Sequence, residues 1–294
     1  MKDLAPRLLL PSHADLADSG SAGADVPRDR HDRPLIHVPG RDKPVPYTRC
    51  TTFVDCIEDK TALATWGKRM VLVGAARDAR ITARAGLLDP DIPGDKQTLN
   101  RLAATAASIA GADTKRERGT HLHALSEHLD RGEPLPATKL ADVADLGAYL
   151  TATLHLDVLE IERLVVVDGL TVAGTPDRIC HYEGPGPDGE PFAGNLIVDL
   201  KTGSVDRGAL KMAMQLAVYS RGRFYDHRTR TRSPLPDVDQ RWGLIIHLPA
   251  GTAQCTVYWI DLTAGWNAAL TAERVRELRR IRTGTLLRPF HPPV

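Results

Sequence analysis

The chain has 294 residues, of which 42% are hydrophobic and 26% charged, and its formal net charge is +1. A net charge this small excludes a strongly basic protein, so any contact with nucleic acid must depend on local clusters of cations. No apolar run reaches the roughly 18 residues of a membrane span. The first residues also lack the apolar stretch of a signal peptide, so we expect a cytoplasmic protein without a membrane partner.

The first 45 residues differ in composition from the rest of the chain. Residues 1–45 are rich in Ser, Gly, Asp, Arg and Pro and contain few regularly spaced apolar residues. Such a segment buries too little apolar surface to offset the entropy of ordering, so we expect a disordered or loosely packed arm. We expect residues 46–294 to form a single domain, with a helical layer over 46–155 and an α/β core over 156–294.

The first half of that domain is rich in Ala and Leu and contains long stretches without proline. This composition favours helices. We expect helices over 59–70 (which 71–73 could extend), 77–87, 96–111, 114–131 and 137–154. The proline-containing segment Glu133-Pro134-Leu135-Pro136 separates the last two.

After residue 157 the pattern changes to short β-branched runs between turn residues. Asp168-Gly169 predicts a tight turn between strands over 163–167 and 170–182. Beyond it, we expect a strand over 195–201, a helix over 207–223, paired strands over 241–248 and 254–260, and a final helix over 263–282 with Trp266, Leu270, Leu278 and Ile281 facing inward. This order predicts an α/β fold with a mixed central sheet flanked by helices.

Two predicted strands bring carboxylates and a lysine toward one place. Strand side chains alternate between faces, so Asp199 and Lys201 point to the same side, and Asp177 lies one hairpin arm away. An isolated Asp-x-Lys is usually a surface ion pair. Here, however, both carboxylates fall in or at the end of strands. Two carboxylates in a small pocket repel each other unless a divalent cation neutralises them. With a lysine that positions or deprotonates a water, these groups predict metal-assisted phosphodiester hydrolysis.

Other polar residues are candidates for the same pocket. Gly119, His123 and Glu127 have the spacing of one helix face, although a surface His–Glu pair explains that pattern equally well. A zinc site of His121 and His123 is rejected, because two residues apart on a helix they cannot chelate one ion. Glu162 is either a solvent-facing strand carboxylate or a metal ligand.

Gln215 and Tyr219 lie one turn apart on the predicted helix after Lys201. They stand beside its apolar stripe rather than within it, so they are placed to reach into a cleft. A plain amphipathic helix with a partly exposed tyrosine is the alternative interpretation.

Taken together, these motifs resemble those of a known nuclease superfamily. Pro176-Asp177, then 21 residues, then Asp199-Leu200-Lys201 resembles the PD-(D/E)XK nuclease signature. The upstream Gly-Thr-x-x-His and the downstream Gln-x-x-x-Tyr resemble the RecB-like exonuclease branch of that superfamily. Residues 47 to about 282 look like the exonucleases of actinobacterial phages and prophages. The motifs in order are Thr51-Thr52-Phe53, Gly119 to His123, Gly174 to Asp177, Asp199 to Gly203, Gln215 to Tyr219 and His247 to Gly251.

The resemblance implies a restriction-endonuclease-like core and a role for each matching residue. Asp177 and Asp199 would ligate Mg²⁺ or Mn²⁺, with the Leu200 carbonyl and His123 as further ligands and Glu162 as an additional candidate. Lys201 would activate or position the attacking water. Gln215 and Tyr219 would contact the DNA strand or orient Lys201. Hard oxygen ligands are those that these cations prefer.

The same resemblance implies an exonuclease that acts at DNA ends in phage-type recombination or replication, alongside a single-strand-annealing protein. Candidate DNA contacts are Arg178, Lys211, Arg221 and Arg223, the last two in a basic cluster that continues to Arg232. Two alternatives stay open. One is an endonuclease of restriction or defence type, and the other is a non-catalytic nucleic-acid-binding module with a relict nuclease core.

Some RecB-like relatives hold an iron–sulfur cluster with four cysteines, three of them closely spaced near the C-terminus. This chain also has four cysteines, at 50, 56, 180 and 255. The closely spaced trio is absent, so we expect reduced thiols and no cluster. The sequence does not indicate which oligomeric state the protein adopts.

Overall fold

The computed structural model describes residues 26–206 and 208–291. Its internal contacts divide the chain into two units, one made of residues 59–126 and the other of the described residues before and after them. The fold is mixed α/β, which confirms the predicted class. Within the described residues, no helix is both long and apolar enough to cross a membrane.

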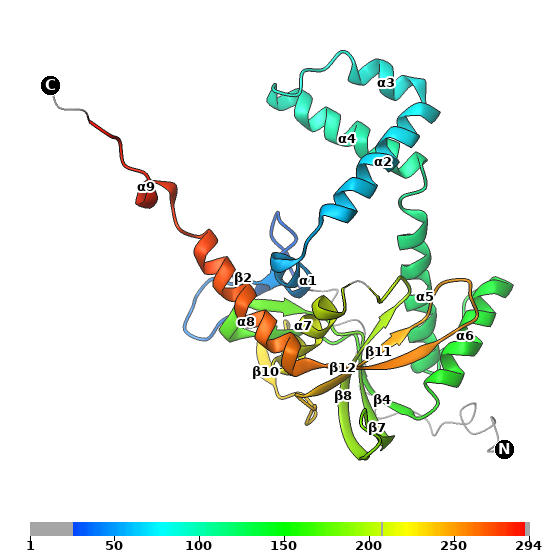
Figure 1. The fold of residues 1–294 in the computed structure, drawn as a ribbon. Coiled ribbons are helices and arrows are strands. Elements are labelled where there is room, and N and C mark those ends of the chain that lie inside the picture. The colour runs from blue at the N-terminus through cyan, green and yellow to red at the C-terminus, as the bar shows by residue number, and fades with distance from the viewer. Residues whose placement is uncertain (1–25, 207, 292–294) are drawn as a thin grey trace. The chain divides into compact units, whose positions relative to one another are not determined.

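The elements follow the predicted order, with several additions (Figure 1). The helices are α1 (Cys50–Val54), α2 (Thr61–Arg77), α3 (Ala79–Ala85), α4 (Pro93–Ile109), α5 (Thr114–Asp130), α6 (Leu140–Ala152), α7 (Ala209–Ser220), α8 (Leu262–Arg279) and α9 (Thr283–Leu286). The strands are β1 (Leu35–Ile36), β2 (Val45–Pro46), β3 (Thr48–Arg49), β4 (Leu156–Ile161), β5 (Val165–Val167), β6 (Val172–Gly174), β7 (Arg178–Pro185), β8 (Pro191–Lys201), β9 (Arg223–Asp226), β10 (Thr231–Ser233), β11 (Trp242–His247) and β12 (Thr256–Asp261).

The unit of residues 59–126 contains α2, α3, α4 and α5 up to residue 126. Helices α2 and α4 cross in contact at Gly74. A Cβ atom on Gly74 would lie 1.7 Å from the carbonyl oxygen of Ala106, so only glycine permits this approach. The boundary of this unit differs from the expected helical layer over 46–155, because α1 and α6 belong to the other unit.

The larger unit is built on two mixed five-stranded sheets. The first has the order β12-β11-β8-β7-β4, in which only β8 and β11 run parallel. The second has the order β10-β9-β5-β6-β3, in which only β3 and β6 run parallel. Strand β8 is therefore the central strand of the first sheet, with a neighbour on each side.

Alternation along β8 decides which face each residue occupies. Leu196, Val198 and Leu200 belong to one apolar cluster, which also contains Tyr149 of α6. Ile197 belongs to the opposite cluster, which contains the buried residues of α7. By the same alternation Asp199, two residues after Ile197, falls on the α7 face of the sheet. A carboxylate thus stands where the pattern of β8 calls for an apolar residue.

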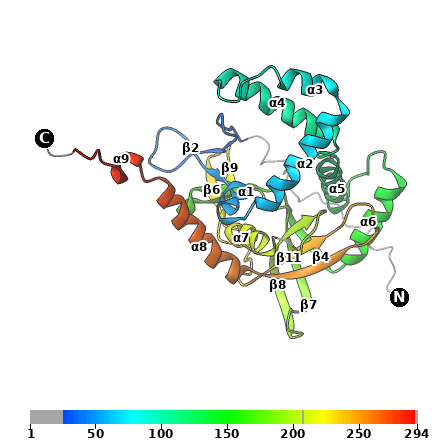
Figure 2. The same ribbon diagram turned by 45° about the horizontal axis from the view of Figure 1, so that its top comes forward.

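Helices α7 and α8 lie side by side in the core cluster that joins both sheets (Figures 1 and 2). Their contact is made through small residues. A Cβ on Gly265 would lie 2.2 Å from the carbonyl oxygen of Ala213, so the two backbones approach closely. The prediction that Leu270, Leu278 and Ile281 face inward is wrong, because these side chains are 48%, 49% and 45% exposed. The buried face of α8 consists of smaller residues and Leu262.

The described part of the expected arm is packed rather than loose. Ile36 is fully buried in a cluster with Val26, Tyr47 and Tyr225 on the second sheet, and β1 pairs with β2. A few well-placed apolar residues order this segment in spite of its polar composition. Residues 1–25 of the expected arm lie outside the described residues.

The predicted strand over 170–182 forms two strands in different sheets. β6 ends at Gly174 in the second sheet, and β7 begins at Arg178 in the first. Between them Pro176, which has no N–H to donate, stops the ladder. Asp177 therefore lies in the crossing between the two sheets. The pairs β5–β6 and β11–β12 occur as predicted, whereas β4, β9 and β10 are strands that the sequence pattern does not predict.

Candidate active site

Asp177 is anchored to the middle of the first sheet. Its Oδ2 atom accepts a hydrogen bond of 2.7 Å from the backbone N–H of Leu200. Leu200 lies between Asp199 and Lys201 on β8, so the bond brings the Asp177 carboxylate to the end of that strand. The structure thus brings together the three side chains on which the predicted chemistry depends.

The turn before Asp177 requires glycine. A Cβ on Gly174 would lie 2.6 Å from the Tyr219 hydroxyl oxygen and 3.1 Å from the Cβ of Cys50. Tyr219 is 3% exposed, and burial followed by the nearby Cys50 and Asp199 raises its pKa well above the usual value. Of the roles expected for Tyr219, direct contact with DNA does not fit this burial. The residue instead packs against the chain that leads to Asp177.

Asp199 and Lys201 form an ion pair on the α7 face of β8. The Lys201 Nζ contacts Asp199 Oδ2, and Gln215 of α7 donates from Nε2 to Asp199 Oδ1 at 3.3 Å. Asp199 is 3% exposed. Gln215, expected to contact DNA or to orient Lys201, is therefore in contact with the carboxylate that pairs with that lysine.

Negative charge is concentrated here beyond what the nearby cations neutralise. Burial, and then the charge of Asp177, raises the pKa of Asp199 to about 7, while Lys201 opposes the shift. Burial, and then the charges of Asp177 and Glu127, raises the pKa of Glu162 to about 7. Four carboxylates therefore share one electrostatic environment. Glu127, which had no expected role beyond a helix face, is one of them.

Glu162 reaches this environment through an unusual backbone conformation. It follows the end of β4, rather than opening the predicted hairpin, and has a left-handed φ of +52°. Its N–H donates to the carbonyl oxygen of Asp177 at 3.1 Å. Glu127 lies on α5 and pairs with Arg131 at 3.0 Å. No sequence pattern indicates a left-handed glutamate, so the sequence does not predict this contact.

The Leu200 backbone completes the set of oxygen atoms. In a strand, the N–H and C=O of one residue point to the same side, toward the same neighbouring chain. Because the Leu200 N–H points to Asp177, its carbonyl oxygen points to that side as well. This orientation fits the expected ligand role of the Leu200 carbonyl.

The residues fit a hard divalent cation by donor chemistry, since carboxylate and carbonyl oxygens are what Mg²⁺ and Mn²⁺ prefer. Across residues 26–206 and 208–291, no group of three or more His, Cys, Asp or Glu side chains is placed so that it could hold a metal ion. Mg²⁺ commonly takes only one or two carboxylates from a protein and keeps several waters. Asp177 and Asp199 correspond to such a partial set.

His123 is half-buried on α5 and belongs to the unit of residues 59–126. Asp177 and Asp199 belong to the other unit. The expected place of His123 among the metal ligands therefore stays a prediction.

Three of the four cations expected to contact DNA are engaged by other groups of the protein. Arg178 is 1% exposed; its Nε donates to Asp130 Oδ2 at 2.5 Å, and its guanidinium lies over the Tyr149 ring. We therefore correct the expected role of Arg178 from guiding the phosphate backbone to holding α5 and α6 against β7. Asp130 pairs with it in the interior, and the charge of Arg178 also opposes the raised pKa values of Asp199 and Glu162.

Lys211 and Arg221 are also occupied. Lys211 pairs with Asp55 and Glu58 at 2.5 and 2.8 Å; burial lowers its pKa, but these two carboxylates outweigh burial and leave the pKa raised. Arg221 donates to the carbonyl oxygens of Ala217 and Gln240 and lies over the Trp266 ring. Both side chains therefore already have partners within the chain. Arg223 on β9 is exposed and keeps its expected role as a candidate DNA contact.

Comparison of the chain with models of protein families finds no match. A search of curated proteins likewise finds no match.

Proposed function

We propose that the chain is a Mg²⁺- or Mn²⁺-dependent DNA exonuclease with a PD-(D/E)XK-type core. The observation that carries the proposal is the bond from the Leu200 N–H to Asp177, which joins that carboxylate to the Asp199–Lys201 pair. A buried carboxylate, a second carboxylate and a lysine at one strand end are the groups that metal-assisted phosphodiester hydrolysis needs.

Asp177 and Asp199 would hold the cation, with the Leu200 carbonyl beside them. The bound cation would polarise the phosphate and lower the pKa of a bound water. The excess of carboxylates over cations supports this assignment, because burial and mutual repulsion raise the pKa of Asp199 and of Glu162 to about 7. A divalent charge would relieve that repulsion.

The remaining residues position these groups. Lys201 places its Nζ at the Asp199 carboxylate, where it would orient the attacking water and stabilise negative charge on the phosphate. Gln215 holds the other oxygen of Asp199 and so limits its rotation. Tyr219 and Gly174 fix the turn that leads to Asp177. We propose DNA ends as the substrate, in recombination or replication beside a single-strand-annealing protein.

The test compares linear and covalently closed circular duplex DNA of the same sequence. We expect release of nucleotides from the linear form in Mg²⁺ or Mn²⁺, none from the closed circle, and none in EDTA. Linear duplexes blocked at one end or the other then give the polarity. Cleavage of the closed circle would replace the exonuclease with an endonuclease, and metal-independent cleavage would remove the proposed chemistry.

A further inference from the structure

Two loops that are distant in sequence are held together beside the second sheet. One connects β1 to β2 and contains residues 37–44; the other connects β9 to β10 and contains residues 227–230. The backbone N–H of His37 donates to the Tyr225 hydroxyl at 3.0 Å, and Arg232 donates to the His37 carbonyl oxygen at 2.9 Å. The rings of His37 and His227 lie 6.1 Å apart. These contacts join the two loops into one continuous surface.

This surface is rich in cations without carboxylate partners. Arg41, Lys43, Arg228 and Arg230 are exposed, and none of them forms an ion pair with a residue in the described ranges. Their neighbour Arg232 is different, because it is neutralised by both oxygens of Asp168 at 2.8 and 2.9 Å. We call the first four side chains, taken together, the loop surface.

The nearby carboxylates do not cancel this charge. Asp226 Oδ1 accepts from the backbone N–H groups of Arg228 and Thr229 at 2.8 and 3.1 Å, so it caps the turn of the β9–β10 connection. Asp42 is exposed between Arg41 and Lys43. The four cations therefore outnumber the two nearby carboxylates.

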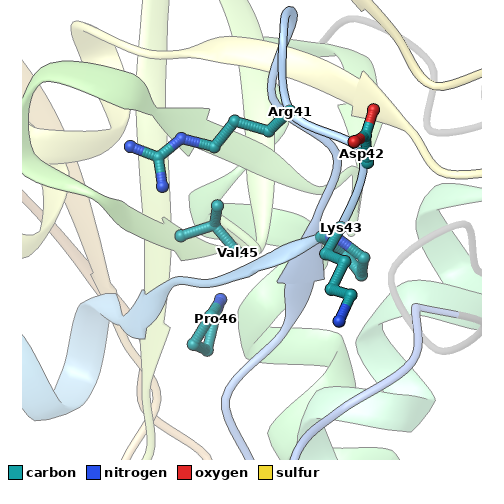
Figure 3. A pocket seen from close by; sticks show the side chains of 6 residues that line it. Arg41, Asp42, Lys43, Val45 and Pro46 are labelled. Carbon is teal, nitrogen blue, oxygen red and sulfur yellow. The ribbon is translucent and has the colours of Figure 1, made fainter.

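A hollow on the first loop is lined by two of the four cations, Arg41 and Lys43. Arg41, Asp42, Lys43, Pro44, Val45 and Pro46 line it. Figure 3 shows the side chains of Arg41 and Lys43 extending in different directions from this strand-and-loop segment, with Val45 beneath. Long cationic side chains around a shallow apolar surface suit the binding of an extended polyanion better than that of a small enclosed ligand.

The second loop leaves its sheet at the end where β5 begins, next to Glu162 in the sequence. Strand β9 runs antiparallel to β5, and the Tyr225 N–H donates to the Leu164 carbonyl oxygen at 2.9 Å. In this register Asp226, the last residue of β9, comes level with Arg163. Arg163 immediately follows Glu162. The β9–β10 loop, with Arg228 and Arg230, therefore lies at the same end of the second sheet as the residue that follows Glu162.

We propose that the loop surface binds the phosphate backbone of duplex DNA next to the active site and holds the duplex during digestion. This inference rests on the proposed function for the identity of the polyanion. It assigns the DNA contact to Arg41, Lys43, Arg228 and Arg230, in place of Arg178, Lys211 and Arg221, whose side chains pair with other groups of the protein. We expect the loop surface to bind DNA without sequence preference, because exposed cations that contact phosphates carry no sequence information.

The test measures binding of the full chain to a short fluorescein-labelled duplex by anisotropy, in EDTA, over a series of KCl concentrations. The variants are Arg41→Gln/Lys43→Gln and Arg228→Gln/Arg230→Gln. A matched control, Arg280→Gln/Arg282→Gln, removes the same charge from exposed positions after α8. Each loop variant should weaken binding and reduce the slope of log affinity against log salt by about 2, since each lost phosphate contact contributes about 0.9. The control should leave the slope unchanged.

Hydrolysis of bis(p-nitrophenyl) phosphate with Mn²⁺ separates this inference from the proposed function, because so small a diester cannot span the loop surface. We expect both loop variants to hydrolyse it at the wild-type rate. An unchanged salt slope in the loop variants, or an equal loss in the control, would overturn the loop surface even if hydrolysis is found. A reduced slope in a protein that hydrolyses neither DNA nor the diester would keep the surface and reject the nuclease.

Discussion

The carboxylate of Asp177 accepts its hydrogen bond from the backbone of Leu200, a residue 23 positions later in the chain. This bond crosses from the junction between the two sheets to the central strand of the first sheet. It fixes Asp177 relative to Asp199 without using a side chain of β8. The arrangement is therefore set by the Asp177 carboxylate and the main chain of β8, so substitution of Asp199 should change the chemistry of the site more than its fold, whereas substitution of Asp177 also alters this bond.

Metal binding gives the first prediction. Calorimetric titration of Mn²⁺ into the wild-type chain should show one class of site that Asp177→Asn and Asp199→Asn each abolish. Gln215→Ala should keep the site but weaken it by about 10- to 100-fold, because a residue that orients a ligand typically has that effect. Wild-type affinity in the Gln215→Ala chain would show that its 3.3 Å contact with Asp199 does not orient the carboxylate.

Arg178 tests the correction from a DNA contact to an internal cation. Arg178→Met removes one partner of a buried ion pair and leaves Asp130 without its guanidinium, so we expect a loss of about 3–5 kcal/mol in the free energy of unfolding by urea. The companion Arg228→Gln, at an exposed position, should stay within about 0.5 kcal/mol of wild type. An equally stable Arg178→Met chain with weakened DNA binding would restore the sequence-based expectation.

Two glycines in helices should respond in opposite directions to alanine. Gly265→Ala places a Cβ 2.2 Å from the Ala213 carbonyl oxygen, so it should lower the free energy of unfolding by about 1–3 kcal/mol as α7 and α8 are pushed apart. A Cβ on Gly147 of α6 would meet no atom within 4 Å, and Gly147→Ala should raise stability by about 0.5–1 kcal/mol. Equal effects at both positions would contradict the close packing of α7 on α8.

The pH dependence of stability should include a contribution from Asp168. Partial burial opposes its ionisation, but hydrogen bonds from Arg232 and Tyr47 outweigh burial and lower its pKa in the folded state. A carboxyl with a lowered folded-state pKa stabilises the fold above its unfolded-state pKa of about 3.9 and loses that contribution as the pH falls toward the folded-state value.

Urea unfolding of wild type and Asp168→Asn at a series of pH values measures this contribution. The difference in unfolding free energy should be constant from neutral pH down to about 5 and should shrink below about 4. A difference that grows on acidification would have the wrong sign for a carboxylate stabilised by Arg232.

The sequence predicts the helices, the class of fold and the convergence of Asp177, Asp199 and Lys201, because these follow from local periodicity and strand alternation. It does not predict that the segment over 170–182 divides between two sheets, since Pro176 breaks the ladder in a way that only tertiary pairing reveals. Nor does it predict the packing of Ile36, for a similar reason: the cluster around Ile36 is completed by Tyr225, far along the chain.

The DNA-contacting cations show where sequence reasoning stops. Composition cannot distinguish an arginine buried against a carboxylate from one in solvent. Arg178 and Arg230 look alike in the sequence, yet the first pairs with Asp130 in the interior and the second stands on an exposed turn with φ of +59°. Only the position of a distant acidic residue separates the two roles.

The most direct measurement of the central claim is digestion of an end-labelled linear duplex in Mg²⁺ by the wild-type chain and by Asp199→Asn. Melting temperature in metal-free buffer serves as the control for folding. We predict that the wild-type chain digests the duplex and that the Asp199→Asn chain does not. The Asp199→Asn chain should nevertheless melt no lower than wild type, because burial raises the pKa of the Asp199 carboxyl to about 7 and the substitution removes that costly buried charge. Digestion by the Asp199→Asn chain at the wild-type rate would contradict the assignment of Asp177, Asp199 and Lys201 as the active site.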